Sequence, residues 1–110
     1  MQETFSLESV KLPGKTYPAQ IVSVTLKTAG EIFGDKTKRN ERQSEADAKA
    51  RPVYEIKFAG QGFAGNAVLS KSDSAKSNIA KYVMRYGTVL GPGVTVMARL
   101  DSEGRAELEL

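Results

Sequence analysis

Several residue types with distinctive chemistry are missing from this sequence, and each absence excludes a class of function. There is no cysteine, so disulfides, thiolate metal sites, iron–sulfur clusters and cysteine nucleophiles are excluded. There is no histidine, which removes the commonest general base and the commonest transition-metal ligand. Neither a Walker-type phosphate loop nor a dinucleotide-binding fingerprint occurs. We therefore expect no enzymatic activity, no metal site and no cofactor.

Long hydrophobic runs are also absent. No stretch approaches the roughly 18 to 20 apolar residues that a membrane helix requires, and the N-terminus lacks the pattern of a secretory signal. The length of 110 residues suits a single domain, and 40% hydrophobic residues are enough for a core. We predict one cytoplasmic domain over residues 1–110 without a membrane partner, in which residues 1–16 form an arm or a short strand.

The charge balance is mildly basic. Sixteen lysines and arginines oppose thirteen aspartates and glutamates, which gives a net charge of +3. Such a charge assists the approach of a polyanion, but it also serves solubility in many small proteins. Composition alone therefore leaves both interpretations open.

The first predicted strand covers residues 17–28, which are rich in β-branched side chains. Val22, Val24 and Leu26 recur at every second position and are predicted to share one face. Ile21 breaks this alternation. We interpret it as a bulge or bend in a strand that serves both halves of a small barrel.

Residues 30–51 differ in character from the rest of the chain. They are dense in charge of both signs, and only Ile32 and Phe33 offer apolar anchors. The stretch Ser44–Ala50 suits one or two helical turns but has no apolar stripe to bury. A connection of this length in a small domain is either functional or disordered. We predict a long, mobile, charged loop between two strands.

Four further strands are predicted, over residues 53–58, 63–70, 94–100 and 106–110. Glycine-bearing turns join the first two and the last two of them. Gly65 within its strand indicates a bend or a close backbone approach. In the strand over 53–58, alternate residues are predicted to face the core (Tyr54, Ile56, Phe58) or the solvent (Val53, Glu55, Lys57).

One helix is predicted over residues 74–86, between the third and fourth strands. Ser72, Asp73 and Ser74 are its N-cap candidates, and Gly87 stands where a C-cap glycine belongs. A single apolar stripe at helical spacing is predicted to cover one end of a barrel, and its members are Ile79, Tyr82, Val83 and Tyr86.

This order of elements resembles the OB-fold, a five-stranded, partly open Greek-key barrel with a helix between strands 3 and 4. The resemblance covers residues 17–110 and rests on element order, since the fold has no signature motif. The expected class is thus all-β with one helix. Within the OB-fold family, the general plan of barrel, helix and charged loop is similar to small phage and archaeal single-strand binders.

The resemblance implies a binding surface on strands 2 and 3. The loops that join strands 1 and 2 and strands 4 and 5 flank this surface and hold the ligand on it. Single strands bind such surfaces by phosphate neutralisation and by base stacking on aromatic rings. Carried over to this chain, it predicts nucleic-acid-binding roles for Lys36, Lys38, Arg39, Arg42, Lys57, Arg105, Tyr17, Phe33 and Phe63.

Each role has a structural alternative. Phe63 begins an alternation with Gly65, Ala67 and Leu69 that favours a core position, and the loop cations are diluted by acidic neighbours. A second function stays open as well. The same barrel could act as a protein-interaction or assembly module, as a homo-oligomer or with another protein, through its strand edges and its long loop.

Overall fold

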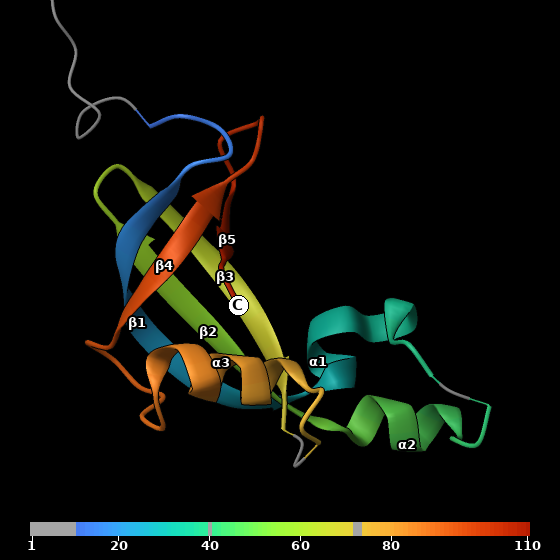
Figure 1. Ribbon diagram of the computed structural model, residues 1–110. Helices are drawn as coiled ribbons and strands as arrows, with labels where there is room; N and C mark the ends of the chain where they lie inside the picture. The colour runs from blue at the N-terminus through green and yellow to red at the C-terminus, as the bar shows by residue number, and fades with distance from the viewer. Residues whose placement is uncertain (1–10, 40, 72–73) are drawn as a thin grey trace, which may run out of the picture.

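A computed structural model describes residues 11–39, 41–71 and 74–110 (Figure 1). Five strands form one antiparallel sheet: β1 (Thr16–Thr28), β2 (Pro52–Gly60), β3 (Phe63–Ser70), β4 (Thr95–Leu100) and β5 (Ala106–Leu108). Their order in the sheet is β3-β2-β1-β4-β5. Because β3 and β5 curl toward each other, the sheet becomes a nearly closed barrel, which is consistent with an OB-like fold.

The predicted fold class is confirmed: the chain is mostly β, and the helix α3 (Asn78–Tyr86) lies between β3 and β4. Residues 1–10 of the expected arm and the N-cap candidates Ser72 and Asp73 lie outside the described residues. No helix in the described part of the chain is long and apolar enough to cross a membrane.

Strand β1 holds the barrel together because it pairs with two neighbours. Residues 16–20 pair with β4, and residues 19–28 pair with β2. The register against β2 shifts between Ile21 and Ser23, which confirms the predicted bulge and leaves Val22 as the extra residue. The bulge bends the strand, so that one strand serves both parts of the barrel.

The bulge also corrects the predicted core face of β1. Ile21 is buried, whereas Val22 and Leu26 are 58% and 57% exposed. The extra residue separates Val22 from the face that Val24 and Leu26 share, and of the predicted trio only Val24 packs against the core. Leu26 is exposed where β1 has β2 as its only paired neighbour.

The main core lies inside the barrel and receives residues from four strands and α3. Its buried members are Ala19, Ile21, Ile56, Phe58, Leu69, Tyr82, Val96 and Ala98. Ile56 and Phe58 face inward as predicted. Val53, predicted to face solvent, is instead fully buried.

The segment between β1 and β2 contains three short helices: α1 (Ala29–Phe33), a 3₁₀ turn η1 (Gly34–Lys36) and α2 (Glu45–Ala50). Ala29 and Ala48 are buried, and the Ala29 N–H donates to the Arg51 carbonyl at 2.8 Å. Neither these two alanines nor the buried Val53 belongs to the main core cluster. The buried apolar residues of this segment are thus alanines, whereas the predicted anchors were the larger Ile32 and Phe33. The mobility of the segment stays a prediction.

Helix α3 covers one end of the barrel (Figure 1). It begins at Asn78, later than predicted, because Ser77 is the N-cap and its hydroxyl accepts from the Ala80 N–H at 3.2 Å. Gly87 caps the other end, as expected, with a φ of 95°. Of the predicted stripe, Ile79, Tyr82 and Tyr86 pack in the core and Tyr82 is fully buried, whereas Val83 is 41% exposed.

Replacing Tyr82 with phenylalanine is expected to lower stability by about 1 kcal/mol at neutral pH, because its hydroxyl donates to the Val89 carbonyl at 2.8 Å. Burial, and secondarily the proximity of Tyr86, raises the pKa of Tyr82. The unfolded chain therefore loses this proton first as the pH rises through about 10, and wild-type stability falls there. Tyr82→Phe should show a shallower decline in urea unfolding between about pH 8 and pH 11. An equally steep decline in the variant would contradict this assignment.

Candidate nucleic-acid interface

Within the described residues, the outer face of β1, β2 and β3 carries one cation without an ion pair. The register places Lys57 between Ser23 on β1 and Asn66 on β3, and its side chain is exposed. Among the described residues Lys57 forms no ion pair. Two residues away on the same face, Glu55 is paired with Lys27 at 3.1 Å, so that second lysine is neutralised. Lys57 is thus the point on this face that is free to meet an anion.

The loop cations fall into two groups. Lys36, Lys38 and Arg39 are exposed, and within the described ranges none of the three forms an ion pair. Arg42 is also exposed but already has an interaction within the chain. Arg39 additionally borders a polar hollow of about 230 Å³ whose lining includes Asp35 and Glu45. The first three cations are the ones available to a ligand.

Lys49 shows how part of this loop is neutralised internally. Its ammonium lies 3.0 Å from Glu45 and 3.6 Å from Asp35, and the hydrogen bond and charge of Glu45 are the main cause of its raised pKa. The pair Glu45–Lys49 spans one turn of α2, and Asp35 links that helix to η1. Two carboxylates are therefore occupied by Lys49, which lessens their opposition to an anion bound nearby.

The aromatic candidates are not on the outer face of β2 and β3. Phe63 packs against the core, and its ring occupies the space where a side chain on Gly60 would begin. Tyr17 lies beside it, with ring centroids 6.3 Å apart, and the Lys11 ammonium lies 4.8 Å above the Tyr17 ring. Phe63 thus occupies the core position that its alternation favoured. Phe33, at the end of α1, is 39% exposed.

The two loops that the resemblance implied lie at opposite ends of the barrel. The β1–β2 segment projects from the end covered by α3, whereas the β4–β5 turn lies at the other end (Figure 1). Arg105 in that turn is bound to Glu103 at 2.6 Å. Asp101 organises the turn, since its carboxylate accepts from the backbone N–H groups of Glu103 and Arg105. Arg105 therefore lies far from the unpaired cations of the β1–β2 segment, and its own charge is balanced by Glu103.

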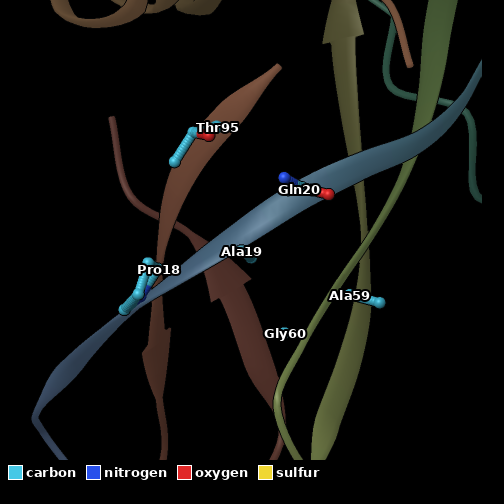
Figure 2. Close-up of a pocket in the computed structure, with 6 residues that line it drawn as sticks. All are labelled: Pro18, Ala19, Gln20, Ala59, Gly60 and Thr95. Carbon is cyan, nitrogen blue, oxygen red and sulfur yellow. The ribbon is translucent and has the colours of Figure 1, made fainter. Parts of the chain in front are cut away.

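A concavity of about 410 Å³ lies on the outside of the sheet, where β2, β1 and β4 run side by side (Figure 2). Gln20 on β1 stands opposite Ala59 on one side and Thr95 on the other. The remaining lining residues are Pro18, Ala19 and Gly60. Sequence reasoning missed this feature, because no motif marks it. Its only signal was the run of small residues at Ala59–Gly60 at the end of a strand.

The described residues contain no cluster of three or more carboxylates that could hold a metal ion. Comparison with known proteins adds no family to the geometry. No protein-family model, no curated protein and no solved structure matches this chain.

Proposed function

We propose that this protein binds single-stranded nucleic acid, DNA or RNA, without catalysing a reaction. The observation that carries the proposal is the set of cations without carboxylate partners in the described structure, on β2 and in the β1–β2 segment: Lys36, Lys38, Arg39 and Lys57. An OB-like barrel with free cations on its strand 2 and its first loop has the means to neutralise phosphates along one strand.

The placement of the aromatic rings determines the expected mode of binding. Tyr17 and Phe63 lie against each other, Phe63 packs against the core and Lys11 covers the Tyr17 ring, so both rings are poorly placed as platforms for stacked bases. Phosphate contacts should therefore supply most of the affinity, and stacking should add little. Such binding is weakly dependent on sequence and strongly dependent on salt. The protein would coat or present a strand passively, in the manner of the small phage and archaeal binders that it resembles.

The test is a titration of a fluorescently labelled dT oligonucleotide, followed by anisotropy at about 50 mM and about 300 mM salt, a range over which phosphate contacts are strongly screened. With three or four phosphate contacts, log K should fall against log salt with a slope of about −2 to −3. Mixed-sequence DNA and RNA of equal length serve as comparisons. If none of these strands binds at the lower salt, the proposal is wrong.

Protein interaction is the second candidate function, and exposed aliphatic side chains favour it. Leu26 stands opposite Tyr54 across β1 and β2, and Tyr54 lines a groove of about 270 Å³ under α3. Val83 borders the same groove, and Val89, 67% exposed, adjoins it in sequence. Exposed apolar side chains gathered at one place commonly mark contact surfaces. Self-association or a complex that persists at high salt, measured by light scattering, would favour this candidate.

A further inference from the structure

The concavity between β1, β2 and β4, whose lining residues Figure 2 labels, has the size of a small-molecule site and a lining of mostly small side chains. Its volume of about 410 Å³ lies within the range of small-molecule sites, roughly 300 to 1,000 Å³. Ala59 and Gly60 form part of the lining, so a planar group can approach the backbone of β2 closely. Gly60 cannot acquire a side chain, because the Phe63 ring and the Pro18 carbonyl occupy that space. The packing of Phe63 and Pro18 thus requires glycine at position 60, which leaves the β2 backbone uncovered in the concavity.

Two unpaired polar side chains border this concavity. The amide of Gln20 and the hydroxyl of Thr95 have no hydrogen-bond partner in the part of the chain that the structure describes. A glutamine amide presents a donor and an acceptor side by side in one plane. Nucleobases present the complementary pair along their edges, and glutamine recognises adenine in this way in DNA complexes. An open site with an uncovered backbone and a planar amide thus suits a flat ligand with a polar edge.

A cation stands beside the concavity at the distance of a nucleotide phosphate. Lys57 and Ala59 point to the same outer face of β2 and are two residues apart, about 7 Å along the strand. Lys57 has the reach to contact a phosphate whose base lies over Ala59. On β1, the bulged Val22 follows Gln20 and leaves an exposed aliphatic side chain on the same side.

We propose that this concavity holds one unstacked base of the bound strand, with Gln20 hydrogen-bonded to the edge of the base and Lys57 on the adjacent phosphate. The inference rests on the proposed function and adds to it a place where the protein contacts a base as well as the backbone. The barrel supplies no aromatic platform on its outer face among the described residues, so the concavity is where base-dependent affinity arises.

The test separates base binding from phosphate binding by using two labelled strands of equal length, one of dT and one of abasic deoxyribose phosphate. Wild-type protein should bind the dT strand about fivefold or more tightly than the abasic strand. Gln20→Ala removes the amide, and Ala59→Leu fills the concavity; either variant should bring the ratio close to one. Ala64→Leu is the matched control, because Ala64 is the cross-strand neighbour of Ala59 and is exposed outside the lining. It should keep the wild-type ratio.

The outcomes distinguish the pocket from the proposed function. If Gln20→Ala and Ala59→Leu retain the wild-type preference while binding stays sensitive to salt, the pocket is wrong and phosphate-based binding stands. If wild-type protein binds neither strand, the proposed function fails. In that case an NMR titration with thymidine monophosphate decides: shifts of the Gln20, Ala59 and Thr95 amides support a nucleotide site, and unchanged amides overturn it. Urea unfolding of each variant establishes that it is folded.

Discussion

Gly65→Ala is expected to lower the free energy of unfolding by about 3 kcal/mol, near the upper end of the usual cost of overpacking a core. A Cβ atom at this position would lie 2.6 Å from Cζ of Phe58 and 2.7 Å from the carbonyl oxygen of Ala106. The Phe58 ring is fully buried and cannot swing away, and the oxygen belongs to the backbone of β5. The extra methyl group therefore forces β3 and β5 apart, at the place where the barrel closes. Urea unfolding followed by circular dichroism measures the loss.

The control for this variant is Ala64→Val, which adds more volume one residue earlier in β3. Ala64 is exposed, so its substitution should change stability by less than about 0.5 kcal/mol. Hydrogen exchange provides a second measurement, because separation of the seam should reduce protection in β5 (Ala106–Leu108) before the other strands. A Gly65→Ala protein with the wild-type unfolding midpoint would show that β5 does not close the barrel against β3.

The order of the strands along the chain and the place of α3 between β3 and β4 could be predicted from the sequence, because they depend on local signals. The alternation in β2, the glycine-bearing turns and the stripe on α3 each act within a few residues. The bulge near Ile21 was predicted for the same reason, since one residue out of phase is visible in the sequence. The exposure of Val22 and Leu26 was predicted wrongly, because it depends on strand pairing: Val22 is the extra residue of the bulge, and Leu26 lies where β1 has β2 as its only paired neighbour.

The helices between β1 and β2 illustrate a different limit. Hydrophobic periodicity finds large side chains, whereas this segment is anchored by Ala29 and Ala48 and by the close approach of Gly30 to Lys49. Small residues carry little hydropathy signal, although their size is what allows the backbones to approach. The burial of Val53 could not be inferred from alternation in β2 either, since that alternation placed it on the solvent face.

The candidate site was predictable in outline only, because the state of each charge depends on tertiary pairing. Lys57 and Arg105 look equivalent in the sequence, yet Arg105 is bound to Glu103 and Lys57 has no partner in the described structure. Likewise the concavity is made by residues from three strands, and Gln20 meets Thr95 only after β1 and β4 pair. The spacing of residues in the sequence predicts neither the ion pair of Arg105 nor the proximity of Gln20 and Thr95.

Replacing Lys36, Lys38 and Arg39 together with alanine is expected to weaken binding to a dT strand by about 100-fold or more at 50 mM salt. Each lost phosphate contact removes about 0.7 from the slope of log K against log salt, so the slope should become shallower by about 2. Lys57→Ala should change the slope by about 0.7. The fold should be unaffected, since all four side chains are exposed.

The matched control replaces Lys71, Lys76 and Lys81 with alanine. These lysines are also exposed, and in the described structure they form no ion pair, so the control removes the same charge from another part of the molecule. If the interface lies on the β1–β2 segment and β2, the control should change affinity severalfold at most, through the weaker long-range field of the protein. Equal losses in the two triple variants would mean that net charge, rather than the placement of cations around the barrel, determines binding. A large loss of affinity in the Lys36, Lys38 and Arg39 variant alone would show that the phosphates bind along the β1–β2 segment. The next residue to test would then be Lys57, where the path of the strand would continue over β2.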